Sequence, residues 1–297
     1  MRSRVLNYFR FCVHTIIRRS NPQGIISDAK TQWWQTEAGA DYFLNGSDAN
    51  NVPAAALMDA VINDQFLQHC PPGSKVLDIG CGHGIVSMFL ARHGVSVVAC
   101  DVSEPLLKVL DQNSAGLDIE IRQGDAHNIP AENDEFDVIV ARMFLGHFPD
   151  WADIVGEMSR CCRPGGKMLL HLSSRENGLF GRRYGGADCT FVSSPEVSVI
   201  NVNPGVYYGE VGQVEIERLC AKYRLRIVEQ VPNTFFLHNR LIGHSLGTKR
   251  FKAYQAELSE RIRNPDVRDF IVWFEKNALQ FMPSWISYYN VLVLEKK

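Results

Sequence analysis

The chain has 297 residues, with 31 Lys and Arg against 33 Asp and Glu, 45% apolar residues and 22% charged residues. This length and composition exclude global disorder and allow one elaborated domain or two small ones with a sizeable core. The formal net charge of −2 gives no overall reason to expect duplex nucleic acid as a partner.

The cysteine pattern and the apolar runs limit where the protein works. The eight cysteines form neither CxxC pairs nor regular spacings, which favours a reducing compartment. No run reaches the roughly 20 apolar residues that a membrane-spanning helix requires. We therefore expect a cytoplasmic protein that is not integral to a membrane.

The N-terminus is basic and amphipathic. Apolar residues recur at helical intervals between residues 5 and 17, with polar residues on the other side. Five arginines precede the first acidic residue, Asp28, at Arg2, Arg4, Arg10, Arg18 and Arg19. Three interpretations stay open: a helix docked on the body of the protein, a helix on an anionic membrane surface, and a cleaved transit peptide.

From residue 75 onward, short β-rich runs alternate with helical ones. Helices are expected at Ala54–His69, Ile85–His93, Glu104–Ser114 and Asp150–Cys162. The predicted strands are KVLDI (75–79), VSVVACD (95–101), LDIEIRQ (117–123), FDVIVA (136–141) and GKMLLHL (166–172). This alternation predicts an α/β fold with a largely parallel, doubly wound sheet and helices on both faces.

The alternation stops after Leu172. A helix is then expected at 214–223, and two further strands are expected at 225–231 and 288–296. With the five strands before them, these make seven predicted strands. We expect an N-terminal helical segment, 1–52, followed by one domain, 53–297, with two insertions. The first, 173–210, shows no regular element, and the second, 238–282, has two helical patterns separated by Pro265.

The segment VLDIGCGHG (76–84) places a buried strand directly before a glycine-rich turn and a helix. Glycines let the backbone approach a ligand closely, and the helix N-terminus offers unpaired N–H groups. A nucleotide-like ligand is expected there.

A dinucleotide is one alternative for that ligand, because Asp101 ends the second strand, where a carboxylate can hold ribose hydroxyls. Two details count against it. The glycines are spaced Gly80-x-Gly82-x-Gly84 rather than G-x-G-x-x-G, and Asp78 lies inside the strand. A buried carboxylate is costly unless it is paired, so Asp78 should serve the loop or a cationic group of the ligand.

Four motifs in order resemble the class I S-adenosylmethionine-dependent methyltransferases. They are VLDIGCGHG, Asp101 at the end of the second strand, GDAHNIP (124–130), and FDVIVARMFLGHFPDW (136–151) with RCCRPGGKMLL (160–170). The resemblance covers roughly residues 57–172 plus the two late strands. It implies a seven-stranded Rossmann-like sheet whose last strand is antiparallel, and S-adenosylmethionine as cofactor.

The same resemblance implies the roles of individual residues. Asp101 would contact the ribose hydroxyls, Asp125 with Ala126 would contact the adenine, and Val102 would pack on the adenine face. The residues implied around the amino-acid part of the cofactor are Asp78, Gly80, Cys81, Gly82 and Gly84. Arg142 is placed either at the cofactor or a substrate anion, or in an ion pair at the rim. A cofactor-binding scaffold without activity remains an alternative.

The segment ARMFLGHFPD after the fourth strand bears on the methyl acceptor. It lacks the Asn-Pro-Pro-Tyr character of enzymes that methylate amino groups of nucleobases or glutamine. Resemblance to the catechol-type enzymes that bind magnesium would place an aspartate after VIVA. No aspartate follows VIVA in this sequence, so we expect no metal. His147 occupies the histidine of an L-x-H-x-x-D pattern and is the candidate general base, with His171 in reserve. The alternative is that His147 only supports the following helix.

The acceptor itself should be bound by the two insertions, because loops at the carboxyl ends of parallel strands surround the ligand crevice. Arginines and aromatics there suit an acceptor with a phosphate or carboxylate and a ring, such as a phosphorylated or lipid-linked sugar. They also suit a solvated surface, which is the more frequent origin of scattered Arg and Lys. A faint likeness to ubiquinone-pathway O-methyltransferases exists in Trp33-Trp34 and Gly39. We expect O-methylation of a small molecule or glycan, with a protein or RNA methyltransferase as the alternative.

Overall fold

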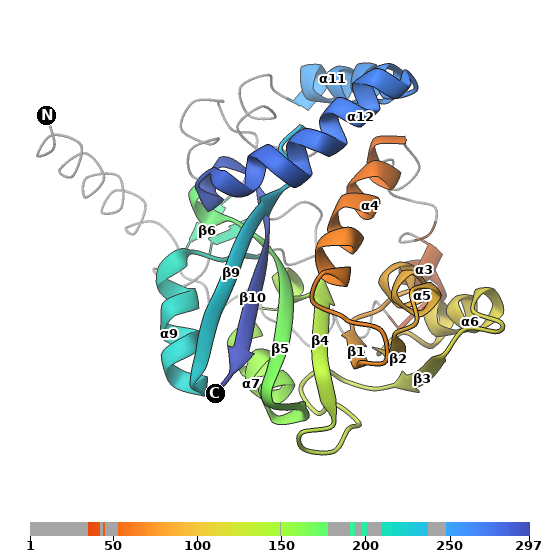
Figure 1. Cartoon of the computed structure of the whole chain (residues 1–297), viewed down its shortest axis with the longest axis vertical. Helices are drawn as coiled ribbons and strands as arrows, with labels where there is room; N and C mark the ends of the chain where they lie inside the picture. The colour runs from red at the N-terminus through yellow and green to blue at the C-terminus, as the bar shows by residue number, and fades with distance from the viewer. Residues whose placement is uncertain are drawn as a thin grey trace, which may run out of the picture.

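The computed structural model describes residues 35–41, 44, 53–148, 150–177, 191–193, 198–200, 209–236 and 248–297. Seven strands form a sheet in the order β3-β2-β1-β4-β5-β10-β9 (Figure 1). Their bounds are β1 Lys75–Ile79, β2 Ser96–Asp101, β3 Ile119–Gln123, β4 Phe136–Arg142, β5 Cys162–Ser173, β9 Leu225–Asn233 and β10 Tyr289–Lys296.

The pairing of the strands confirms the expected Rossmann-like topology. The first five strands pair in parallel, whereas β10 pairs antiparallel with both β5 and β9. The chain order reverses between β1 and β4, so that the carboxyl ends of these two strands flank a crevice. This is the edge where a ligand site is expected.

Helices cover both faces of the sheet (Figure 1). One face carries α4 (Pro53–Leu67), α5 (Ile85–Arg92) and α6 (Glu104–Asn113), and the other carries α7 (Trp151–Cys161) and α9 (Gln213–Tyr223). Alternate residues of each inner strand point to opposite faces, so both faces are apolar. In β4, Val138 and Val140 pack towards α4 and α5, whereas Ile139 and Ala141 pack towards α7.

The first insertion contains strands that the sequence pattern did not indicate. A small antiparallel sheet of β6 (Phe191–Ser193), β7 (Ser198–Ile200) and β8 (Gly209–Glu210) lies within 173–210. Strands of two or three residues are too short to show an alternating pattern. Beyond them, Ser174 forms an isolated bridge with Val211 at the end of β5.

The second insertion contains the two predicted helices, α11 (Thr248–Arg261) and α12 (Pro265–Trp273). Asn264 caps α12, because its side chain accepts a hydrogen bond from Asp266 N. Apolar side chains of both helices pack on the beginning of α4. In Figure 1 this places the insertion at the end of the sheet to which the carboxyl end of β5 points.

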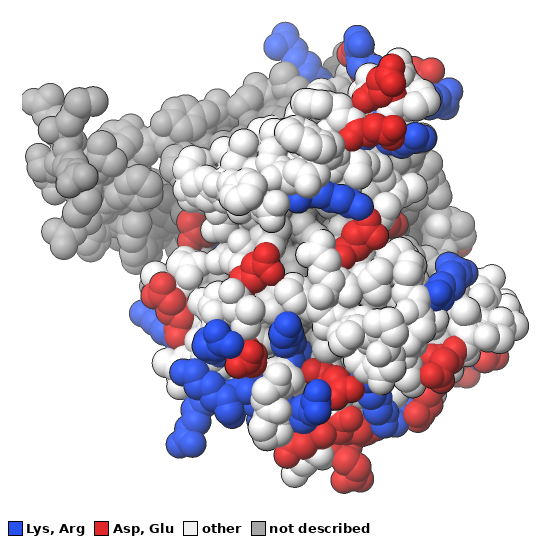
Figure 2. All heavy atoms as spheres, viewed as in Figure 1, with Lys and Arg blue, Asp and Glu red and all other residues white. Residues whose placement is uncertain are grey.

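The surface matches the near-neutral composition. In Figure 2, Lys and Arg are interspersed with Asp and Glu over the lower part of the molecule. Ion pairs such as Lys296–Asp134, with the two groups 2.7 Å apart, join charges of opposite sign. Charged side chains of both signs also gather at the upper right of this face, where α11 and α12 lie in Figure 1. Large apolar side chains are exposed in α12 and the turns that follow it, at Phe270, Trp273, Phe281 and Trp285.

Candidate active site

The glycine loop turns directly after β1. Gly80, Gly82 and Gly84 all have positive φ angles, of 69°, 56° and 85°. The loop is fixed to the neighbouring strand β2, since Cys100 O accepts hydrogen bonds from Gly80 N at 2.8 Å and Cys81 N at 3.2 Å. Helix α5 then begins without a side-chain cap, which leaves its N-terminus available to a ligand.

Two of these glycines lie against side chains that are distant in the sequence, and no sequence pattern predicted these contacts. A Cβ atom at Gly80 would overlap the ring of Phe144, and a Cβ at Gly84 would overlap Leu110 of α6. Glycine at 84 therefore lets α5 approach α6, whereas glycine at 80 accommodates an aromatic ring that lies on the loop. Met143, with φ of 50°, turns the chain immediately before Phe144. A left-handed methionine directly after a strand is a strained position of the kind found at ligand sites.

Asp78 is buried beneath the loop, with 1% of its surface exposed. Ser87 Oγ, on the first turn of α5, donates a 2.6 Å hydrogen bond to its Oδ2. Burial raises the pKa of Asp78 to about 6, against the hydrogen bond from Ser87 and the charge of Arg142, which favour the ionised form. Burial also raises the pKa of the Cys81 thiol well above its ordinary value, so this thiol stays neutral.

Asp101 ends β2 and reaches the glycine loop. Its Oδ2 accepts a hydrogen bond from Gly82 N at 2.8 Å, and its Oδ1 accepts one from Ser103 N at 2.9 Å. Burial raises its pKa against these backbone hydrogen bonds. Each carboxylate oxygen keeps a second lone pair, so this side chain can still accept from ligand hydroxyls. Val102, half-buried, follows it in the chain.

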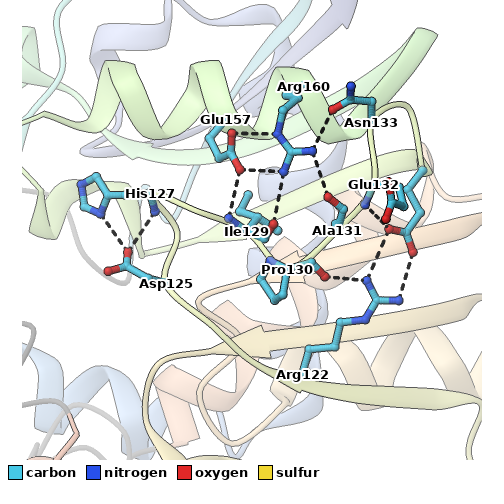
Figure 3. Close-up of polar contacts among 11 residues, drawn as sticks. Arg122, Asp125, His127, Ile129, Pro130, Ala131, Glu132, Asn133, Glu157 and Arg160 are labelled. Carbon is cyan, nitrogen blue, oxygen red and sulfur yellow. Dashed lines mark hydrogen bonds and ion pairs between the residues drawn. The ribbon is translucent and has the colours of Figure 1, made fainter.

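The loop from β3 to β4 carries Asp125, which Figure 3 shows, and the next residue, Ala126. Ala126 is buried in the core, whereas Asp125 is half-exposed and accepts two contacts from His127 at one oxygen, Oδ1. Burial alone would raise the pKa of Asp125, but the N–H groups of His127 outweigh it and the pKa is lowered. The other ring nitrogen of His127 lies 2.9 Å from Asp150 Oδ2.

Two arginines fix the rest of this loop, as Figure 3 shows. Arg160 of α7 donates to the carbonyl oxygens of Ile129 and Ala131, and Arg122 of β3 donates to that of Pro130. Glu157 accepts a 3.0 Å hydrogen bond from Ile129 N and also pairs with Arg160. The loop is thus held in one shape from both sides, a feature that the sequence motifs did not indicate.

Arg142 and His147 follow the end of β4. Arg142 forms an ion pair with Asp59 of α4, and its Nε is buried without a hydrogen-bond partner in the described part of the chain. His147 is the last residue of a short 3₁₀ helix, Leu145–His147, and is half-buried. The structure therefore brings His147 to the same edge of the sheet as the glycine loop, because Phe144, which begins that turn, lies on Gly80.

The reserve candidate, His171, lies deeper. Only 2% of its surface is exposed, and its Nε2 lies 3.2 Å from Asn233 Oδ1. Its ring stacks on Tyr289 with centroids 4.9 Å apart. Asn233 Nδ2 in turn donates to Gln65 Oε1 of α4 at 3.1 Å. This buried network joins three strands to α4 and gives His171 a packing role.

Several sequence candidates lie outside the described residues. These are the N-terminal arginines and apolar stripe, Trp33, Trp34, and most of the basic and aromatic residues of the two insertions. Of that last group, Arg175 is described and forms an ion pair with Glu215 of α9.

Comparison with known proteins identifies the domain. A family model described as a methyltransferase domain matches residues 77–170, from β1 to β5. The chain carries a class I S-adenosylmethionine-dependent methyltransferase domain. Over 106 residues the chain is 38% identical to a ubiquinone biosynthesis O-methyltransferase of Pseudomonas entomophila. The aligned segment covers 35% of this chain and 46% of that protein. The chain spans about half the length of the curated relatives that it matches.

Solved structures show the same fold for the methyltransferase domain. The 1,6-didemethyltoxoflavin-N1-methyltransferase of Burkholderia thailandensis, with S-adenosylhomocysteine bound, has a TM-score of 0.56 at 13% identity and covers 94% of this chain and 93% of its own. SpnF, a cyclase, has a TM-score of 0.51 at 17% identity and covers 80% of each chain. Because the fold also occurs in a cyclase, the fold alone does not specify the reaction.

The residues present fit S-adenosylmethionine, the cofactor of this domain family. The glycine loop turns directly after β1 with positive φ at Gly80, Gly82 and Gly84, and α5 presents an uncapped N-terminus. Asp101 and Asp125 each keep carboxylate lone pairs that can accept hydrogen bonds from the hydroxyl and amino groups of such a ligand.

Proposed function

We propose that the protein is a methyltransferase that methylates a hydroxyl group of a small molecule. The observation that carries this proposal is the position of His147 at the end of β4, in the turn whose first residue, Phe144, lies on the glycine loop. The O-methyltransferase relatives support a hydroxyl acceptor. The alternative acceptor is a phosphorylated or lipid-linked glycan.

The site residues divide the work. Around the amino-acid part of the cofactor would lie Asp78, Gly80, Cys81, Gly82 and Gly84. Asp101 would accept hydrogen bonds from the ribose hydroxyls, Val102 would pack on the adenine, and Asp125 with Ala126 would hold the adenine.

When bound, S-adenosylmethionine supplies an electrophilic methyl group. His147 then accepts the proton of the acceptor hydroxyl as the new bond to oxygen forms, and a positioned base of this kind contributes about 10²–10⁴-fold to rate. Arg142, paired with Asp59, keeps Nε available to an anionic group of cofactor or acceptor.

The test is turnover with a panel of phenols, phenolic acids and sugar phosphates. S-adenosylhomocysteine release is followed continuously, and each product is identified by mass spectrometry as the acceptor plus one methylene group. Methylation at oxygen supports the proposal. Binding of the cofactor without turnover on small molecules, proteins or RNA would favour a scaffold, and turnover only on protein or RNA would replace the proposed acceptor class.

We also propose a cytoplasmic protein with peripheral contact to anionic membrane. No helix in the described ranges is long and apolar enough to cross a bilayer. Two observations support a surface contact: the basic, amphipathic sequence before Asp28, and the exposed aromatic side chains at and after α12, including Trp273 and Phe281. Vesicle sedimentation tests this proposal, as described in the Discussion.

A further inference from the structure

His127 lies between two carboxylates that belong to different parts of the site. Its Nδ1 lies 2.8 Å from Asp125 Oδ1, and its Nε2 lies 2.9 Å from Asp150 Oδ2. Asp125 belongs to the loop after β3, whereas Asp150 directly precedes α7 and follows His147 by three residues. The imidazole is therefore a link between the segment expected at the adenine and the segment that carries the candidate base.

The side chain of Asp150 contacts His127 and does not cap the N-terminus of α7. Aspartate at the residue before a helix commonly accepts a hydrogen bond from the first turn. Here Asp150 makes no such side-chain cap, and its carboxylate faces His127. A residue type suited to capping α7 has thus been turned towards the loop.

The geometry requires a charged imidazole. Both atoms that face the ring nitrogens are carboxylate oxygens, which accept hydrogen bonds, and a neutral imidazole has only one N–H to donate. Burial lowers the pKa of His127, but its two carboxylate partners outweigh burial and the pKa is raised. The other charged group at this end of α7, Asp153, also lies in the field of His127 and is paired with Lys222 of α9 at 2.8 Å.

The contacts leave Asp125 oriented for a ligand. Both hydrogen bonds from His127 end on Oδ1, and Oδ2 accepts none from the described residues. Figure 3 shows this second oxygen pointing away from His127. Arg122 and Arg160 hold the far half of the loop. In the near half, His127 adds its contacts to the backbone hydrogen bonds from Gly124 N to Asp101 O and from Asn128 N to Asp125 O.

We propose that His127 is a positioning residue, which as an imidazolium orients the carboxylate of Asp125 towards the amino group of the cofactor's adenine and joins it to the segment of His147. This inference rests on the proposed role of Asp125 in cofactor binding. His127 touches neither the methyl group nor the acceptor, and acts through Asp125.

Calorimetry with S-adenosylhomocysteine between about pH 6 and pH 9 tests the inference. His127→Gln should weaken binding about three- to tenfold at the acidic end, where the wild-type imidazole is charged. As pH rises, wild-type affinity should fall towards that of the variant, and Asp150→Asn should move this fall to lower pH. His93→Gln, at the exposed end of α5, is the control and should behave as wild type. The ligand's own titration is common to all variants and cancels in their ratios.

A second ligand separates positioning from a general loosening of the loop. In S-inosylhomocysteine an oxygen replaces the amino group of the adenine, so the penalty of His127→Gln should shrink with this ligand. An equal penalty with both ligands, or a wild-type to His127→Gln ratio that does not change with pH, would overturn the inference while leaving the proposed function intact. Failure of the wild-type protein to bind S-adenosylhomocysteine would overturn the proposed function itself and this inference with it.

Discussion

The carboxylate of Asp101 accepts a 2.8 Å hydrogen bond from the backbone N–H of Gly82, 19 residues earlier in the chain. The side chain at the end of β2 thus shapes the glycine loop as well as facing the expected ribose.

Asp101→Ala should therefore lower cofactor affinity for two reasons, the lost acceptor and a looser loop. Hydrogen bonds to a charged group are worth about 1.5–3 kcal/mol, so the loss should be about ten- to a hundredfold. Calorimetry with S-adenosylhomocysteine measures it, with the exposed Asp118→Ala as control. The assignment of Asp101 to the cofactor site would be contradicted by unchanged affinity in Asp101→Ala. Tighter binding of NAD than of S-adenosylhomocysteine by the wild-type protein would also contradict it.

Replacement of Gly80 by alanine should be costly because of Phe144. The positive φ costs an alanine about 1–2 kcal/mol, and the overlap of its Cβ with the ring adds about 1–3 kcal/mol. Gly116→Ala is a matched control, since Gly116 has φ of 79° but nothing within 4 Å of its Cβ position. Chemical denaturation of both variants measures the difference.

The overlap can be tested by removing the ring. Phe144→Ala should recover the part of the Gly80→Ala loss that exceeds the Gly116→Ala loss, so the two changes should be non-additive. Additive losses would show that Phe144 does not lie on the loop in solution.

The free energy of unfolding should depend on pH through Glu275. This side chain is fully buried and accepts a hydrogen bond from Phe236 N at 3.3 Å, and burial raises its pKa to about 7, against the backbone N–H donors of residues 234–236. The folded state therefore binds the proton more tightly than the unfolded state. Stability is present below the unfolded pKa of about 4.5 and falls as pH rises through about 7, by on the order of 3 kcal/mol.

Glu275→Gln should remove that part of the pH dependence, because the amide does not ionise and its oxygen can still accept from the backbone. Urea denaturation at a series of pH values compares it with wild type and with Glu217→Gln, an exposed glutamate on α9. If the stability of wild type and Glu275→Gln changes in parallel with pH, the buried carboxylate is not the cause.

Membrane contact should require the basic N-terminus. Full-length protein should sediment with anionic vesicles at low salt and be released as salt rises, because charge attraction adds to apolar burial. A version starting at Ser27 should bind more weakly, and neutral vesicles should bind both forms little. Equal sedimentation of the two forms with anionic vesicles would exclude the N-terminal segment as the anchor.

Much of the fold follows from local patterns. KVLDI and FDVIVA predict β1 and β4 because each is a short apolar run next to a turn or loop, and both were placed correctly to within one residue. Pro265 marks the break between α11 and α12 because proline cannot continue a helix but suits its first position. These features depend on neighbours in sequence.

The parts of the site that were missed depend on residues far apart in the chain. His127 and Asp150 are 23 residues apart, and Arg142 and Asp59 are 83 apart, so no spacing rule connects them. The ring of Phe144 lies on Gly80 because the chain turns with a left-handed conformation at Met143. A methionine in the sequence does not predict that conformation. Sequence motifs indicated the ligand edge of the sheet, and the structure adds which side chains hold it in shape.

The last prediction concerns His147 and the chemistry. If its neutral imidazole accepts a hydroxyl proton as the methyl group is transferred, His147→Gln should lower turnover by about 10²–10⁴-fold with little change in cofactor affinity. The wild-type rate should fall at acidic pH, since a protonated imidazole cannot accept the proton. Turnover on the best acceptor of the panel, the Kd for S-adenosylhomocysteine and the Tm are measured on the same variant.

A purely structural His147 gives a different result. Because it closes the 3₁₀ turn that leads into α7, its loss would then lower the Tm and cofactor affinity together, while the pH profile kept its wild-type shape. His127→Gln provides the comparison, because we expect it to weaken cofactor binding while the proton acceptor remains. Near-normal turnover in His147→Gln would remove the general-base role and leave an acceptor that is already deprotonated when it binds.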